Sequence, residues 1–254
     1  MADRGLQDAI RAAGGVTELA RRIGISQPSV SNWTRVPADR VIAVESASGI
    51  ARTVLRPDLY AEPNVDDVAR GRAQEYALLA RLLTDPPDTA FLKQIGQLQG
   101  DDTVLGAAHH ELAEAAKRTS AADVEREFFR LFVGVGRGEF LPYASYYATG
   151  FLHERPLARL RQDLISFGIA RGEGVAEPED HASILCEIMA GLASGQLPAS
   201  EEAGRTIFEN HLAPWMGRFF ADLERSDAAE FYKPVGTLGR VFMEIETEAF
   251  ALPL

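Results

Sequence analysis

Apolar residues recur every three or four positions along most of this 254-residue chain, and few stretches alternate apolar and polar residues with a period of two. The spacing is clear at Tyr76, Leu79, Ala80 and Leu83, and again at Phe128, Leu131 and Phe132. Spacings of three and four place side chains on one face of an α-helix, whereas a half-buried strand requires strict alternation. The pattern therefore predicts an all-α fold.

Glycines and prolines divide the chain into segments of ordinary helix length. The stretch 57–68 contains Pro57, Pro63 and several acidic residues, a composition typical of a linker between domains. We expect a small domain at residues 1–62, called the head below, and a larger helical domain at residues 63–254.

Charge is distributed unevenly between these two parts. Residues 1–60 carry eight basic and six acidic side chains, whereas the whole chain has 26 basic and 37 acidic ones and a net charge of -11. The larger domain is therefore strongly acidic, which disfavours nucleic acid and favours cationic partners. The slightly basic head is still able to touch phosphate through a local patch.

Composition and the amino terminus indicate a cytoplasmic protein. The single cysteine, Cys186, excludes an intramolecular disulfide and a cysteine-rich metal centre. The first eight residues carry acids where a signal peptide needs bases. Since no apolar run approaches the roughly 20 residues that span a bilayer, we expect no membrane insertion.

The spacing of small and apolar residues in positions 16–33 predicts a helix-turn-helix. Ala20 lets two helices approach, Gly24 suits a left-handed turn, and Val30 belongs to the small core between the helices. Ser26 is placed to cap the second helix, with Pro28 in its first turn. This segment, with its closing Leu-Arg-Pro-Asp-Leu-Tyr at residues 55–60, resembles the Cro-like YdaS family of antitoxin and repressor domains.

In such a unit the second helix enters the major groove of DNA. The expected base-reading residues are Gln27, Ser29, Ser31 and Asn32. Arg21, Arg22 and Arg35 are expected to contact phosphates. The alternative is a packing or dimerisation module that does not read DNA, because a net charge of +2 neutralises few phosphates.

Two motifs in the larger domain carry a second resemblance. Residues 125–152 read EREFFRLFVGVGRGEFLPYASYYATGFL, and residues 177–194 read EPEDHASILCEIMAGLAS. The domain resembles the TorD/DmsD family of redox-enzyme maturation chaperones, across roughly residues 70–250. The positions that carry the resemblance are Phe128, Leu131, Phe132, Gly134, Gly136, Pro142, Tyr143, Ser145, Tyr147, Glu177, Pro178, Asp180 and His181.

The resemblance implies an all-helical chaperone that binds the twin-arginine signal peptide of an apo-molybdoenzyme subunit until its cofactor is loaded. Two guanidinium groups followed by an apolar segment require an acidic rim beside an apolar groove. Glu177, Glu179 and Asp180 could supply that rim. The aromatic residues that could line the groove are Phe140, Tyr143, Tyr146 and Tyr147.

The peptide-binding residues expected from the resemblance are Tyr143, Ser145, Tyr147, Glu177, Pro178, Asp180 and His181. A structural alternative exists for the last segment, since residues 177–180 also read as a helix start and His181 as a hydrogen-bonding partner of a neighbouring loop. The Phe128, Leu131 and Phe132 stripe has the spacing of core residues rather than of a groove. Gly134 and Gly136 suit a tight turn.

Catalytic interpretations have less support, so we expect no enzyme, no metal and no cofactor. His109 and His110 point about 100° apart on a helix and cannot chelate one ion as an i, i+4 pair would, which favours a solvated helix here. Cys186 lies in an apolar helical run typical of a buried, inert thiol. The glycine-rich turn lacks the Lys-Ser/Thr ending of a nucleotide loop.

The sequence therefore predicts a cytoplasmic TorD-like chaperone with a Cro-like head. The alternative is a DNA-binding transcriptional regulator whose helical domain senses a peptide or protein partner. A homodimer is expected only by analogy with the two families.

Overall fold

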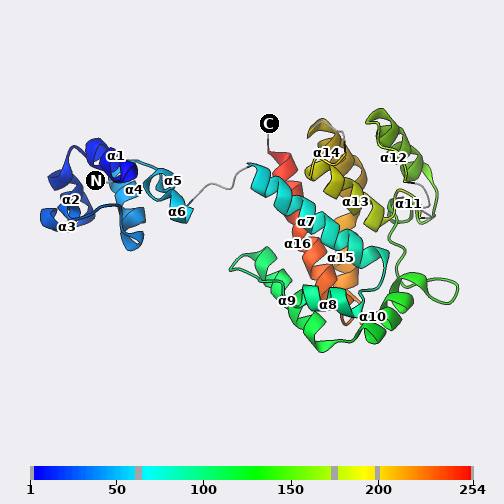
Figure 1. Ribbon diagram of the computed structural model, residues 1–254. Coiled ribbons are helices and arrows are strands. Elements are labelled where there is room, and N and C mark those ends of the chain that lie inside the picture. Colours follow the sequence, from blue (N-terminus) through cyan, green and yellow to red (C-terminus); the bar gives the residue numbers. More distant parts are fainter. Residues whose placement is uncertain (1–2, 61–64, 173–176, 198–200, 253–254) are drawn as a thin grey trace. The chain divides into compact units, whose positions relative to one another are not determined.

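The computed structural model describes residues 3–60, 65–172, 177–197 and 201–252 (Figure 1). Regular structure in these residues is helical, apart from one isolated antiparallel bridge between Tyr143 and His181, which confirms the predicted all-α fold. The chain divides into two compact units, residues 1–68 and residues 69–254. The boundary predicted between residues 62 and 63 lies outside the described residues.

The smaller unit contains the head and is built from short helices around one core. Its helices are α1 (Arg4–Ala13), α2 (Val16–Ile23), α3 (Gln27–Ser31), α4 (Val41–Ser48), α5 (Arg52–Leu55) and α6 (Pro57–Tyr60), with a 3-10 turn at Ala38–Arg40. Leu6, Leu19, Val30, Val44 and Leu55 are fully buried between them. The linker predicted from residue 57 onwards is therefore wrong for its first four residues, because they form α6.

The helix-turn-helix is formed as predicted. Gly24 ends α2 in the left-handed conformation, with φ at +73°. Ser26 caps α3 by accepting a hydrogen bond from the Ser29 backbone N–H. Ala20 and Val30 are buried at the junction of the two helices.

The larger unit is a helical bundle. Its α-helices are α7 (Val65–Thr84), α8 (Thr89–Ile95), α9 (Val104–Arg118), α10 (Ala121–Phe128), α11 (Ala144–Thr149), α12 (Arg155–Ser166), α13 (Ala182–Ala193), α14 (Glu201–Ile207), α15 (Met216–Arg225) and α16 (Tyr232–Ala251), with π-helical turns at Phe129–Val133 and Phe208–Leu212. The closest helix pair is α15 with α16, and α9 packs against α16 (Figure 1). Gly239 permits this approach, since a Cβ there would overlap the Phe220 ring. Among the described residues, every helix is too short or too polar to cross a bilayer.

Two buried carboxylates fix α16 to distant parts of the chain. Glu127, at the end of α10, accepts hydrogen bonds from the backbone N–H groups of Glu230, Phe231 and Tyr232 at 2.8, 3.0 and 2.8 Å. Glu246 accepts two hydrogen bonds from Arg72 at 2.8 Å each and a third from the Tyr76 hydroxyl at 2.8 Å. The first carboxylate caps the start of α16, and the second ties its far end to α7.

Candidate functional site

The two motifs of the larger unit lie side by side. The Ala144 N–H donates to the Asp180 carbonyl at 2.9 Å, and the Ala182 N–H donates to the Pro142 carbonyl at 2.8 Å. The Asp180 side chain adds a third link by accepting from the Ser145 N–H at 2.9 Å. The start of α11 is therefore fixed to the segment that leads into α13.

His181 is the N-cap of α13. Its ring Nδ1 accepts a hydrogen bond from the Ser183 N–H at 3.2 Å and lies 2.7 Å from the Ser183 hydroxyl oxygen. Burial lowers the pKa of His181 to about 4, so the ring is neutral at pH 7 and Nδ1 is able to accept. The alternative interpretation of residues 177–180 as a helix start is right about the place, but the capping residue is His181, and Asp180 bonds α11 instead.

Three of the residues predicted to bind a peptide lie below the surface. Asp180 is 1% exposed, His181 is 7% exposed, and Ser145 is fully buried. The Ser145 hydroxyl and the second Asp180 carboxylate oxygen have no hydrogen-bond partner among the described residues. The Asp180 side chain links α11 to the start of α13 and the His181 side chain caps α13, and direct contact of these residues with a peptide stays a prediction.

The outer layer of the same region is aromatic and acidic. The Tyr143 hydroxyl donates to the exposed Glu177 carboxylate at 2.6 Å, and the Tyr143 ring packs edge-on against His181. Burial and the Glu177 carboxylate raise the pKa of Tyr143 above its usual value. Tyr146 and Tyr147 follow on α11, both half-buried. We use the name α11 surface for Tyr143, Tyr146 and Tyr147 at α11 together with Glu177 and Glu179 of the segment bonded to it.

Arginines of the chain itself already contact this surface. The Arg137 guanidinium lies 5.2 Å from the Tyr146 ring centre and donates to its hydroxyl at 2.5 Å. Arg218 lies 5.0 Å from the Tyr147 ring centre. Both contacts are cation–π interactions, in which a planar guanidinium stacks over an aromatic face.

Of the three acids predicted to form a rim, Glu177 is exposed, Glu179 is half-buried and Asp180 is buried. Glu179 accepts two hydrogen bonds from Arg161, at 3.0 Å from Nε and 2.8 Å from Nη2. Burial raises the pKa of Glu179, but the hydrogen bonds that this carboxylate accepts and the positive charges of Arg161 and Arg171 together outweigh burial, so that this pKa lies below its usual value. Pro178 is half-buried in the connecting turn, where its carbonyl accepts from the His181 N–H at 3.0 Å.

The aromatic stripe that follows α10 belongs to the core, as its spacing predicts. Leu131 is fully buried, and Phe128 and Phe132 pack against the same core. Phe140 packs on Phe132 and Phe219, so it joins this core rather than lining a groove. Gly134 and Gly136 have φ values of +65° and +89° and form the tight turn.

The residues considered for catalysis are structural. His109 is not solvated as expected, because its Nε2 lies 2.9 Å from a Glu75 carboxylate oxygen and the side chain is largely buried. Cys186 is fully buried, and burial raises its thiol pKa, as expected for an inert cysteine. No cluster of three potential metal ligands is found in the described part of the chain.

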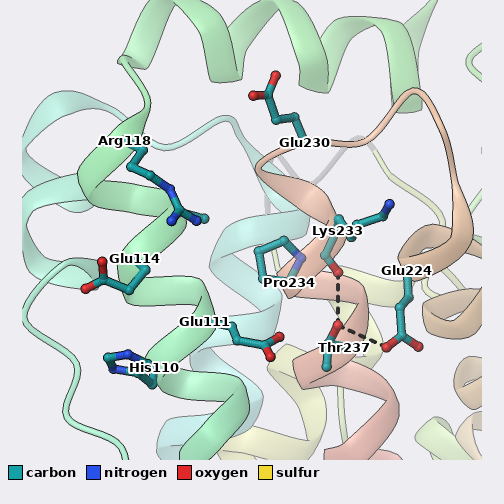
Figure 2. A pocket seen from close by; sticks show the side chains of 10 residues that line it. His110, Glu111, Glu114, Arg118, Glu224, Glu230, Lys233, Pro234 and Thr237 are labelled. Atoms are coloured by element: carbon teal, nitrogen blue, oxygen red, sulfur yellow. Dashed lines mark hydrogen bonds between the residues drawn. The ribbon is translucent and has the colours of Figure 1, made fainter.

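A surface pocket of about 530 Å³ lies elsewhere in the larger unit, between α9, the end of α15 and the start of α16 (Figure 2). Its charged lining includes Glu111, Arg118, Glu230 and Lys233, so both signs of charge are present. None of the residues predicted from the sequence to bind a peptide lines it.

The predicted DNA-reading residues of the head are all exposed. These are Gln27, Ser29, Ser31 and Asn32, and Gln27 donates to the Ser31 hydroxyl at 2.7 Å. The arginines expected on phosphates are paired with carboxylates of the head itself. Arg21 and Arg22 contact Glu18 at 2.6 and 3.0 Å, and Arg22 also donates to the Ala47 carbonyl at 2.9 Å.

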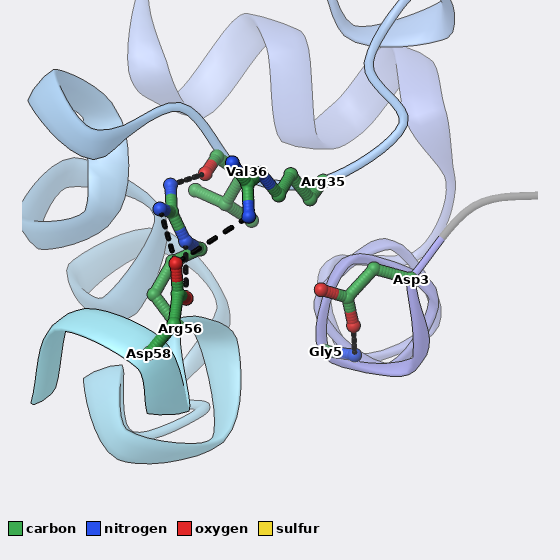
Figure 3. Close-up of polar contacts among 6 residues, drawn as sticks. All are labelled: Asp3, Gly5, Arg35, Val36, Arg56 and Asp58. Atoms are coloured by element: carbon green, nitrogen blue, oxygen red, sulfur yellow. Dashed lines mark hydrogen bonds and ion pairs between the residues drawn. The ribbon is translucent and has the colours of Figure 1, made fainter. Parts of the chain in front are cut away.

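Arg35 belongs to a cluster of hydrogen bonds and ion pairs that joins residues 35–36 to residues 56–58 of the head (Figure 3). We call this cluster the Arg56 clamp. Arg56 is buried, donates to the Val36 carbonyl at 2.7 Å and makes two further hydrogen bonds to Asp58 at 2.7 Å each. Arg35 lies 3.4 Å from the same Asp58 carboxylate. The Arg56 hydrogen bonds lower the pKa of Asp58 to about 2, so this carboxylate stays charged.

Arg137, Arg161 and Arg218 are the site residues that sequence reasoning missed. Arg161 and Glu179 are 18 residues apart, and Arg218 and Tyr147 are 71 apart. A single sequence carries no signal for such pairs, because the contact depends on how whole helices pack.

Comparisons with known proteins agree with both resemblances. The family model described as nitrate reductase delta subunit matches residues 98–221, and that of the bacterial toxin YdaS matches residues 6–64. The chaperone protein TorD of Vibrio cholerae is 28% identical over 158 residues, 57% of this chain and 72% of that relative. The TorD protein of Aliivibrio fischeri is 24% identical over 203 residues, 71% of this chain and 94% of that relative.

Among solved structures, a redox enzyme maturation protein from Archaeoglobus fulgidus aligns with a TM-score of 0.48 and 18% identity, over 73% of this chain and 98% of that one. The sequence matches lie in the larger unit and in the head separately, in the same order as the predicted domains. The larger unit is therefore similar to the TorD chaperones, and the amino-terminal unit is similar to the YdaS family and forms a helix-turn-helix.

Proposed function

We propose that this chaperone binds the twin-arginine leader of an apo-molybdoenzyme subunit in the cytoplasm and holds it until the cofactor is in place. The observation that carries the proposal is the α11 surface, where the Tyr143 hydroxyl bonds the Glu177 carboxylate, Glu179 follows two residues later, and Tyr146 and Tyr147 follow on α11. A guanidinium group pairs with a carboxylate through two parallel hydrogen bonds and stacks on an aromatic ring. Both kinds of contact are available on this surface.

The chain's own arginines support the assignment of ligand chemistry. Arg137 stacks on Tyr146, and Arg161 makes two hydrogen bonds to Glu179. The surface therefore accommodates one guanidinium group stacked on a ring and another that donates two hydrogen bonds to a single carboxylate oxygen. The half-buried rings of Tyr143 and Tyr147 have apolar surface that the apolar segment of a leader could contact.

Ser145, Asp180 and His181 act in this proposal as positioning residues. They join the start of α11 to the start of α13, and this places Tyr143 and Glu177 at hydrogen-bonding distance. Retention of the leader then requires binding alone, and no bond is made or broken.

Hydrogen–deuterium exchange of the full chain locates the leader. We expect a synthetic leader with an Arg-Arg pair followed by an apolar segment to slow amide exchange in residues 143–149 and 177–185, because bound peptide suppresses local opening. Slowed exchange confined to residues 110–118 and 230–237, around the pocket of Figure 2, would place the peptide elsewhere and contradict the proposal.

DNA binding by the head is a second candidate function, favoured by the exposure of Gln27 and Asn32 on a properly capped α3. We expect a gel shift on the upstream region of its own gene at about 0.1 M salt, and loss of that shift in a Gln27→Ala, Asn32→Ala variant. Each base contact contributes about 1–3 kcal/mol, so losing two weakens specific binding at least about tenfold. Gln94→Ala, an exposed change on α8, is the control. A shift unaffected by the double substitution, or no shift, argues against DNA reading by α3.

A further inference from the structure

We infer that Glu179 receives a guanidinium group of the leader and that Arg161 occupies this position while the chaperone is free. The inference rests on the proposed function, and it names the carboxylate involved and the group that the leader must displace. It follows from an asymmetry in burial between the two partners of one ion pair.

Glu179 is the sheltered partner. Its side chain is only 13% exposed, yet it remains a carboxylate anion. A shielded charge without a partner is unfavourable, because water no longer solvates it fully. Glu179 therefore requires a cation in every state of the protein.

Arg161 is the loosely held partner. It reaches Glu179 from α12, its side chain is 47% exposed, and both hydrogen bonds go to one carboxylate oxygen. The second oxygen is 3.9 Å from Arg171, which is beyond hydrogen-bonding distance. An exposed ion pair contributes little, so a displaced Arg161 side chain loses little when it turns to water.

Neighbouring acids are less suited to the first guanidinium. Asp180 is buried beneath α11 and already accepts from the Ser145 N–H. Glu177 is exposed, and its side chain accepts from the neutral Tyr143 hydroxyl. Glu177 and Glu179 are two residues apart, so adjacent arginines of one peptide find two carboxylates on one short turn.

Removal of Arg161 is therefore expected to increase the affinity for the leader, although the substitution removes an ion pair. Without Arg161, Glu179 keeps Arg171 at 3.9 Å from its other oxygen, but a guanidinium group of the peptide no longer competes with the two Arg161 hydrogen bonds. We expect Arg161→Gln to lower the Kd for the Arg-Arg leader about fivefold, the factor set by an exposed ion pair.

The experiment measures the Kd of the Arg-Arg leader peptide for full-length wild type and four variants. Arg159→Gln is the matched control, since it removes the same charge from an exposed position of α12. Glu179→Gln is expected to weaken binding about tenfold or more, because a charge-assisted pair of hydrogen bonds is lost. Adding Arg161→Gln to Glu179→Gln should then change nothing further, which shows that both residues act at one position.

The outcomes separate this inference from the function on which it rests. If wild type binds no leader, the proposed function and the inference both fall. If wild type binds, but Arg161→Gln matches Arg159→Gln or binds more weakly than wild type, the function stands and the inference is overturned. Tighter binding by Arg161→Gln that persists in the Glu179→Gln background would also overturn it, since the gain would come from long-range charge alone.

Discussion

Substituting Glu127 with alanine is expected to lower the free energy of unfolding of the larger unit by about 3–5 kcal/mol. The Glu127 carboxylate is 6% exposed and accepts from three consecutive backbone N–H groups at the start of α16. The first N–H groups of a helix have no partner within the helix, and the positive end of its dipole favours a negative charge. Alanine would leave these buried donors unsatisfied.

Urea unfolding followed by circular dichroism measures this effect. Glu127→Gln keeps an acceptor oxygen and loses the charge, so an intermediate loss of about 1–2 kcal/mol is expected. Glu125→Ala, an exposed change on the same helix, should alter stability by less than about 0.5 kcal/mol. A Glu127→Ala variant as stable as the Glu125→Ala control would show that Glu127 does not cap α16.

Local chemistry accounts for the features of the fold that the sequence predicts well. Spacings of three and four reveal helices, and the glycine at position 24 with the serine at position 26 reveals the turn and the cap of α3. Each of these signals acts within a few residues. The Glu127 cap joins positions more than 100 residues apart, so no local pattern in the sequence predicts it.

The candidate site also combines features that the local sequence predicts with features that depend on distant parts of the chain. Most of the residues predicted to bind a peptide fall in the Pro-Tyr-x-Ser and Glu-Pro-x-Asp-His motifs, and these two segments lie side by side in the structure. How deeply each side chain is buried was not predicted. Asp180 and His181 lie beneath the surface, whereas Tyr143 and Glu177 reach it. Depth depends on what packs above a residue, and Arg161 and Arg218 come from distant helices.

The head shows why charge counts alone mislead. Its net charge is unchanged by pairing, but several of its arginines already contact carboxylates of the unit, because Glu18 pairs with Arg21 and Arg22 and Asp58 pairs with Arg56. Exposed pairs of this kind exchange readily for phosphate, whereas the buried Arg56 clamp does not. Local pairing therefore has to be known before phosphate contacts are assigned.

A titration with three peptides tests whether this protein recognises a pair of guanidinium groups. The peptides are one leader with Arg-Arg, Lys-Lys or Ala-Ala at the same two positions, each added to the full-length chain in a calorimeter at fixed salt. Lysine keeps the charge but cannot form the planar two-hydrogen-bond contact or stack on a tyrosine as arginine does. Alanine removes the charge as well.

We expect the Arg-Arg leader to bind about tenfold more tightly than the Lys-Lys leader, and about a hundredfold more tightly than the Ala-Ala leader. That order requires both charge and guanidinium geometry, the two properties that the α11 surface offers through Glu177, Glu179 and its tyrosines. Equal affinity for all three peptides, or no binding of any of them, would contradict it.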